Sequence, residues 1–215
     1  MIALLPDVDR GVAVLGAHCD DIAIGAGATL LGLCAAVPGL VVHALILTGA
    51  GTPREAEERA ALAAFCPGAQ LQVTVGDLPD GALPAYWAQA KGTVRALRRQ
   101  CDPDLVLAPA PHDAHQDHRT LAELVPTEFR THTTLGYEIL KWESDLAQPA
   151  VLMPVDETAA RKVELLHQHY PSQHQRTWFD AESFLGLMRV RGVQSGVRYA
   201  EGFHCSKLVI GKVCA

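Results

Sequence analysis

The sequence predicts an α/β fold: a Rossmann-like, doubly wound, mostly parallel sheet with helices on both faces and a less regular C-terminal third. Two observations predict it. Short apolar runs bounded by Gly or Pro, such as 12–17 and 105–108, are typical of strands that are buried in a parallel sheet. These runs alternate with longer stretches of helical composition, which indicates right-handed β-α-β crossovers.

The first part of the chain contains the clearest elements. We expect strands at 12–17, 41–47, 71–75 and 105–108, and helices at 26–36, 54–65, 85–100 and 115–128. A loop separates the first strand from its helix, and Pro38-Gly39 ends that helix. Thr52-Pro53 provides an N-cap and a first helical residue for the second helix.

The C-terminal third gives weaker signals. We expect extended segments at 133–139 and 150–155, a further helix at 180–190, and short strands or ordered loops at 199–203 and 207–210. Asp156 is expected to cap a helix that runs to His169 and is stopped by Pro171. Because no linker or internal repeat interrupts the chain, we expect a single domain over residues 1–215.

Composition narrows the function classes. A formal net charge of -6 argues against nucleic acid and anionic membrane surfaces as partners. No apolar run approaches the roughly 20 residues of a transmembrane helix, and no signal peptide is evident, so we expect a cytoplasmic protein without membrane insertion. The six cysteines lack CxxC spacing, which argues against a zinc knuckle or a disulfide framework.

Two segments rich in imidazoles and carboxylates follow two of the predicted strands. His18-Cys19-Asp20-Asp21 comes after the run 12–17, and His115-Gln116-Asp117-His118 follows the run 105–108. Ligands of open α/β sheets bind beyond the carboxyl ends of such strands, so we expect both segments in the same kind of place. Zinc accepts these nitrogen and oxygen donors, as do iron, cobalt and nickel. Together the segments predict a divalent metal site.

The residue types also suggest roles within such a site. His18 and Asp21 can both face one ion, while Asp20 between them is close enough to take a proton from an activated water. On a helix, His115 and His118 share a face, so that one imidazole can bind the metal and the other an oxyanion. Asp117 can hold the tautomer of an imidazole from behind.

Alternatives exist for both segments. Gly25-Ala26-Gly27 suggests a dinucleotide loop, but such a loop needs GxGxxG directly after the strand. Here seven residues separate Ala17 from Gly25, and two carboxylates among them would repel a pyrophosphate. The plainer alternative is that Asp20-Asp21 is a solvated turn and that 109–119 is a polar loop that is rich in histidine.

Both segments together resemble the motifs of the PIG-L/LmbE-like family of zinc-dependent de-N-acetylases. The family's AHPDDxxxGxGG motif is similar to residues 17–28, and its HxDH motif is similar to 115–118, with Asp113 two residues earlier. Weaker similarities occur in chain order at Leu47-Thr48, Arg54-Glu55, Tyr137-Glu138, Ser172-Gln173 and 199–203. The resemblance spans roughly residues 12–205.

The resemblance implies a metal-dependent hydrolase that removes an N-acetyl group from an amino sugar and releases acetate. The substrate would be an N-acetylglucosamine-type glycoconjugate or a small biosynthetic intermediate. It implies that His18, Asp21 and His118 bind zinc. Hydrolysis of a non-sugar N-acyl or thiol-conjugate amide on the same scaffold, or metal binding without catalysis, are the alternatives. Related proteins often assemble, so a homo-oligomer is an open expectation.

The same resemblance implies the remaining site residues. Asp20 would be the general base, His115 would stabilise the tetrahedral oxyanion, and Asp117 would orient His115 or a metal ligand. Substrate contacts are expected from Arg54, His112, Tyr199 and Glu201. For His112 and Asp113 we favour a solvated loop over the substrate pocket, and Arg54 could equally be an exposed charge at the start of its helix.

The chain departs from the family motif in two places. Cys19 stands where the family has proline, which removes a restraint on φ and introduces a thiol that could in principle bind a metal. Ala28 stands where the family often has glycine. Neither departure removes a proposed ligand or the base.

Overall fold

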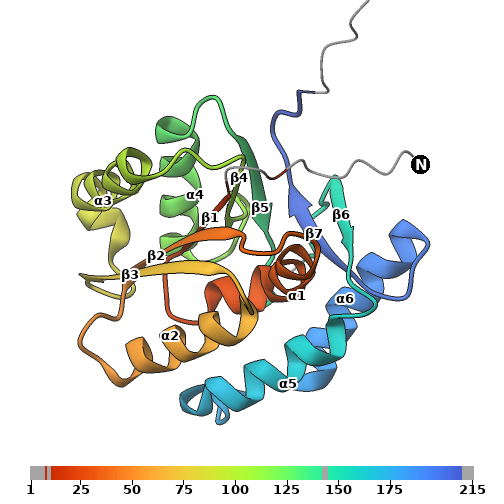
Figure 1. The fold of residues 1–215 in the computed structure, drawn as a ribbon. Coiled ribbons are helices and arrows are strands. Elements are labelled where there is room, and N and C mark those ends of the chain that lie inside the picture. The colour runs from red at the N-terminus through yellow and green to blue at the C-terminus, as the bar shows by residue number, and fades with distance from the viewer. Residues whose placement is uncertain (1–7, 9–10, 142–144, 210–215) are drawn as a thin grey trace, which may run out of the picture.

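A mostly parallel sheet forms the centre of the computed structural model, which describes residues 8, 11–141 and 145–209 (Figure 1). The strands are β1 Val12–Gly16, β2 Val41–Thr48, β3 Gln70–Leu78, β4 Leu105–Pro109, β5 Thr133–Tyr137, β6 Val151–Pro154 and β7 Ala200–His204. The helices are α1 Asp21–Ala36, α2 Pro53–Phe65, α3 Trp87–Gln100, α4 Gln116–Glu128, α5 Ala159–His169 and α6 Ala181–Ser195, with short 3-10 turns at Leu83–Tyr86 and Pro171–Gln173.

The sheet order is β3-β2-β1-β4-β5-β7-β6. The first five strands in this order run parallel, whereas β7 pairs antiparallel with both β5 and β6. The α/β fold class is therefore confirmed, and the antiparallel part is confined to the C-terminal third.

Helices cover both faces of the sheet, as the strand sequences require. Successive side chains of a strand point to opposite faces, and β1 is buried on both: Val12 and Val14 belong to one core, Ala13 and Leu15 to the other. The first core lies under α1, α2, α5 and α6, and the second lies under α3 and α4 (Figure 1). Among the described residues, no helix combines the length and apolar character that crossing a membrane requires.

Helix α1 differs most from the expectation, because it begins at Asp21 rather than at residue 26. The Asp21 carboxylate accepts the N–H groups of Ala17 and His18, at 2.9 and 2.8 Å. These bonds close a tight turn at residues 17–20, so the connection between β1 and its helix is shorter than expected. The first histidine–aspartate segment consequently lies on this turn and on the first helical residue.

The expected cap of α5 is also wrong. Thr158, not Asp156, is the N-cap residue. The Asp156 carboxylate instead accepts the N–H of Tyr199 at 2.6 Å and ties the start of α5 to the start of β7. Residues 207–209 are not a strand, and residue 210 lies outside the described residues. The other expected elements are present, with β3 and α6 longer than expected.

The topology brings the two histidine-containing segments together. β1 and β4 are neighbouring parallel strands, so their carboxyl ends meet at the same edge. The strand order also reverses between them, because the chain proceeds outward to β3 on one side and to β5 on the other. Ligands of open α/β sheets bind at such switch points.

Candidate metal centre

Donor atoms of three residues converge at the ends of β1 and β4: one ring nitrogen each from His18 and His118, and the two oxygens of Asp21. Nδ1 of His18 lies 3.1 Å from Nε2 of His118 and 3.4 Å from Oδ2 of Asp21. Oδ1 of Asp21 lies 3.2 Å from the same His118 nitrogen and has no hydrogen-bond partner in the described structure. Ligand atoms held tetrahedrally at 2.0–2.1 Å from zinc are about 3.3 Å apart. The spacing of these atoms therefore fits a tetrahedral cation.

The hydrogen bonds behind the rings fix which nitrogens face inward. Nδ1 of His118 lies 2.8 Å from Oδ2 of Asp113, and Nε2 of His18 lies 3.0 Å from Oδ2 of Asp117. An ionised carboxylate only accepts hydrogen bonds, so these outer nitrogens carry protons. Each ring then directs a lone pair at the other and at Asp21. Three acceptors at this distance are stabilised by a shared proton or by a cation between them, and the residues present fit a divalent metal.

The electrostatics of the cluster favour positive charge at its centre. Burial alone would lower the pKa of His18, but Asp21, Asp117 and Asp80 raise it to about 12. The pKa of His118 is raised to about 9, against burial, by Asp21 and Asp113. Burial would raise the pKa of Asp21, yet the two imidazoles hold it well below its usual value. The Asp21 carboxylate thus stays ionised and attracts a proton or a metal cation.

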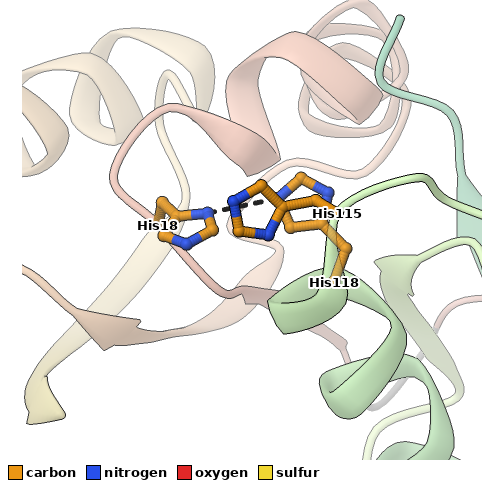
Figure 2. A group of neighbouring side chains, drawn as sticks. All are labelled: His18, His115 and His118. Carbon is orange, nitrogen blue, oxygen red and sulfur yellow. Dashed lines mark hydrogen bonds between the residues drawn. The ribbon is translucent and has the colours of Figure 1, made fainter. Parts of the chain in front are cut away.

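Other donor combinations are close as well. His18, His115 and His118 each place a ring nitrogen within 4.8 Å of the others. Figure 2 shows the three rings gathered at one place. A second set, formed by His18, Asp80 and Asp117, meets the same distance limit, and Asp80 Oδ1 lies 3.1 Å from His18 Nε2. Asp80 follows β3 and had not been singled out in the sequence.

His115 is the N-cap of α4 rather than a helical residue, and its ring stacks on His118 with centroids 4.8 Å apart. Its Nδ1 accepts the N–H of Asp117 at 3.1 Å, so the proton of the neutral ring is on Nε2. Burial and the charges of His18 and His118 lower the pKa of His115. His115 is therefore a neutral imidazole with one N–H, which suits a hydrogen-bond donor to an oxyanion.

Asp20 has an unusual backbone conformation beside the three donors. Its φ of 114° and ψ of -27° make it the one non-glycine residue with positive φ among the described residues. Such a conformation costs on the order of 1–3 kcal/mol and persists only where the surroundings hold it. The buried carboxylate of Asp20 forms an ion pair with Arg54, with 2.8 Å between Oδ2 of Asp20 and Nη2 of Arg54. Oδ1 of Asp20 has no hydrogen bond in the described structure.

The pKa of Asp20 is raised, because burial and the charge of Asp21 outweigh the attraction of Arg54. A carboxylate of raised pKa that lies next to a cation site and has one unbonded oxygen is suited to accept a proton.

Glu58 is a second buried carboxylate at this site, and the sequence analysis missed it. It accepts the main-chain N–H of Asp20 at 2.8 Å and the hydroxyl of Tyr170 at 2.6 Å. Burial, with the charge of Asp20 adding to it, raises the pKa of Glu58 to about 8. A signal was available: Glu58 lies four residues after Arg54, on the same face of a predicted helix.

Cys19 packs away from the donor atoms. Its thiol donates to the carbonyl of Thr48 at 3.7 Å, and the glycine at 49 makes room, because a Cβ there would lie 2.7 Å from the sulfur. Burial and the charge of Glu58 raise the pKa of the thiol to about 12. The residue that replaces the motif proline is therefore a protonated packing group.

The four residues expected to contact substrate lie in different surroundings. Arg54 is partly exposed and bonds to Asp20. His112 is exposed, and its ring lies 5.3 Å from that of His204. Tyr199 is tied through its N–H to Asp156.

Glu201, the fourth expected substrate contact, is buried. It is 4% exposed and pairs with buried Lys162 at 2.6 Å. It also accepts the N–H groups of Ala28 and Thr29 within α1, at 3.1 and 2.8 Å, and so holds that helix from the side. Ala28, where the family often has glycine, lies at this contact.

Comparisons with known proteins identify the family and the fold. Residues 13–128 match the family described as PIG-L: GlcNAc-PI de-N-acetylase. The conserved protein TT1542 from Thermus thermophilus has a TM-score of 0.77 at 24% identity, over 95% of this chain and 98% of that chain. N,N'-diacetylchitobiose deacetylase from Pyrococcus horikoshii has a TM-score of 0.70 at 20% identity, over 93% of this chain and 84% of that chain.

A third solved structure has a different printed activity. GalB, the 4-carboxy-2-hydroxymuconate hydratase from Pseudomonas putida KT2440, has a TM-score of 0.76 at 15% identity, over 96% of this chain and 100% of that chain. At these identities the structural likeness shows the fold, and the family match covers the part of the chain that carries both histidine segments.

Proposed function

We propose, from the premise that the chain belongs to the PIG-L family of GlcNAc-PI de-N-acetylases, that it is a metal-dependent deacetylase of amino sugars. It would hydrolyse the N-acetyl group of an N-acetylglucosamine-type glycoconjugate or small molecule and release acetate. One observation carries the proposal: the inward-facing nitrogens of His18 and His118 lie 3.1 Å apart, and each lies 3.2–3.4 Å from an oxygen of the Asp21 carboxylate, Oδ2 for His18 and Oδ1 for His118. Asp20 and His115 flank them.

The metal would be held by Nδ1 of His18, Oδ1 of Asp21 and Nε2 of His118. Zinc is our choice because the donor types and spacing suit it, although iron, cobalt or nickel accept the same donors. When bound, such an ion polarises the amide carbonyl and lowers the pKa of a water molecule. Asp113 and Asp117 keep the two imidazoles oriented for this purpose.

Asp20 would act as the general base and then as the acid. It takes a proton from the attacking water as the oxygen–carbon bond forms, and it passes that proton to the nitrogen as the carbon–nitrogen bond breaks. The products are a free amine and acetate. The raised pKa of Asp20 favours both transfers, because a catalytic group works best when its pKa is near the working pH.

His115 would stabilise the oxyanion of the tetrahedral intermediate. Its Nδ1 is engaged by the N–H of Asp117, so Nε2 carries the proton that can be donated. Removal of one such donor typically lowers kcat by about 10²–10³-fold. Among the expected substrate contacts, Arg54 is the best placed, because its guanidinium already lies beside Asp20 and its Nε has no hydrogen bond in the described structure.

The fold alone does not select this chemistry, since one solved relative is named a deacetylase and another a hydratase. The same donors could also serve hydrolysis of a non-sugar amide or of a thiol conjugate. We favour N-acetyl hydrolysis because the family match covers both histidine segments.

The test is a screen of N-acetylated sugars with the purified, zinc-loaded protein. Mass spectrometry should detect the loss of one acetyl group from at least one sugar, together with an equal amount of acetate. A chelator should abolish turnover, and added zinc should restore it. Turnover that survives complete metal removal, or no acetate from any sugar or simple amide tested, would contradict the proposal.

A further inference from the structure

One face of α2 holds the turn that follows β1. Arg54 and Glu58 are four residues apart, so they share this face. Nη2 of Arg54 donates to Oδ2 of Asp20 at 2.8 Å and also contacts the carbonyl of Cys19. Oε2 of Glu58 accepts the main-chain N–H of Asp20 at 2.8 Å. Helix α2 therefore binds Asp20 at both its side chain and its backbone.

These two bonds restrain different degrees of freedom. The bond from Arg54 fixes the carboxylate. The bond to Glu58 fixes the peptide N–H. The φ angle of Asp20, 114°, is the rotation about its N–Cα bond and relates this N–H to the side chain. An L-residue leaves this region unless something holds it there. Of the contacts that the structure gives for the Asp20 N–H, Glu58 is the acceptor.

Glu58 is itself held for this task. Its side chain is fully buried, and the hydroxyl of Tyr170, at the end of α5, donates to the same Oε2 at 2.6 Å. Its other oxygen has no hydrogen bond in the described structure. A buried polar group with an unbonded oxygen is costly to keep even when it is neutral, so a role that requires its acceptor oxygen explains its presence better than a role in packing.

We propose that Glu58 is a positioning residue that holds Asp20 in its left-handed conformation and so keeps the Asp20 carboxylate beside the metal centre. The inference rests on the proposed function, because it assumes that Asp20 is the base. Glu58 acts through Asp20 and contacts no proposed metal ligand.

The experiment compares Glu58→Ala and Glu58→Gln with wild type and with Glu57→Ala. Glu57 is the matched control, because it lies next to Glu58 on α2 and also accepts two hydrogen bonds. They come from the N–H and the hydroxyl of Ser172, in the turn that follows α5, at 3.0 and 2.6 Å. Glu58→Ala should lower kcat about 100-fold, as displacement of a reacting group by about 1 Å does. KM and the zinc content per chain should stay within about twofold.

Glu58→Gln should recover most of the lost kcat, because its amide oxygen can accept from both Asp20 and Tyr170. Glu57→Ala should leave kcat unchanged. A kcat within about twofold of wild type for Glu58→Ala would overturn the inference, as would an equal loss in Glu57→Ala. If Glu58→Ala does not fold, Tyr170→Phe removes the hydroxyl that holds Glu58 and should lower kcat about tenfold, and an unchanged kcat there would overturn it.

A crystal structure of the zinc-loaded Glu58→Ala variant separates this inference from the proposed function. Asp20 should then leave the left-handed region, with a negative φ. If wild type hydrolyses no amide at all, the proposed function fails, and this structure still decides the inference. A φ of Asp20 that stays near the wild-type value without Glu58 would contradict it.

Discussion

The carboxylate of Asp113 holds His118 from behind, with 2.8 Å between Oδ2 and Nδ1. Because Nδ1 must donate to this carboxylate, Nε2 keeps the lone pair that faces His18 and Asp21. The other oxygen of Asp113 accepts the N–H of His115 at 2.7 Å. One carboxylate therefore orients both the histidine proposed to bind the metal and the turn that carries the histidine proposed to bind the oxyanion.

Replacement of Asp113 by alanine should weaken metal binding. Without its partner the imidazole of His118 can rotate and lose its tautomer, and such outer partners typically account for about 10–100-fold in metal affinity. Zinc titration with a competing chelator measures the effect. Asp77→Ala, which removes an exposed carboxylate from β3, serves as the control and should not change the affinity. Equal affinities in the two variants would show that Asp113 does not support the metal centre.

Asp20→Asn should separate catalysis from metal binding. The amide keeps the size of the side chain but cannot accept the proton, so kcat should fall by about 10²–10⁴-fold. The three proposed metal ligands are unchanged, and the zinc content should stay at the wild-type level. Inductively coupled plasma mass spectrometry and acetate release, measured on the same preparation, provide the two readouts. A large loss of zinc would mean instead that Asp20 belongs to the metal ligands.

The buried Glu58 should make the metal-free protein less stable as the pH rises. Its pKa is raised from 4.5 to about 8, so over this interval the folded state keeps a proton that the unfolded state has released. The free energy of unfolding then decreases with pH, by at most about 1.4 kcal/mol per pH unit from this group.

The measurement is urea unfolding of wild type and Glu58→Gln at several pH values. Because glutamine does not titrate, the stability of wild type relative to the variant should fall between about pH 5 and pH 8 and then level off. A difference that stays constant over this range would show that Glu58 is ionised throughout.

The buried ion pair between Arg191 and Glu138 should be important for stability. Nε of Arg191 lies 2.8 Å from Oε2 of Glu138, and its Nη2 donates to the carbonyl of Ala147 at 2.8 Å. Arg191→Ala would leave a buried carboxylate unpaired, which typically costs about 3–5 kcal/mol.

The control for this prediction is Arg161→Ala. Arg161 makes an ion pair of similar length, 3.0 Å, with Glu164, but both side chains are exposed. Removal of an exposed pair changes stability by about 0–1 kcal/mol. Chemical denaturation of both variants should therefore show a large loss for Arg191→Ala only. Similar losses would mean that water reaches the Arg191–Glu138 pair.

Much of the fold could be predicted because its signals are local. The runs that became β1, β2 and β4 are apolar on both faces, and few local structures other than a buried strand suit a run of that length. The start of α1 was predicted five residues too late, because Asp21 begins the helix by bonding back to Ala17 and His18. The sequence shows the carboxylate but not the direction in which it points.

The candidate site divides in the same way. His18, Asp20, Asp21 and the 115–118 segment stand out because unusual residue types are concentrated next to strand ends. Asp113 had been considered part of a solvated loop, yet it is 8% exposed and bonds to His118. Glu58 and Asp80 come from other elements, and each looks like an ordinary charged surface residue in its own segment.

By itself, the sequence determined the fold class, the two strand ends at which the chemistry-bearing residues lie, and the residues suited to bind a metal. The tertiary structure decided which charged groups hold those residues in place: Asp113 behind His118, Asp117 and Asp80 behind His18, and Glu58 beneath Asp20. The physical reason is the separation along the chain of the residues that interact. Apolar periodicity acts between neighbours in the chain, whereas Glu58 meets Asp20 across 38 residues and Asp117 meets His18 across 99. Only the packing of the helices on the sheet determines such pairs.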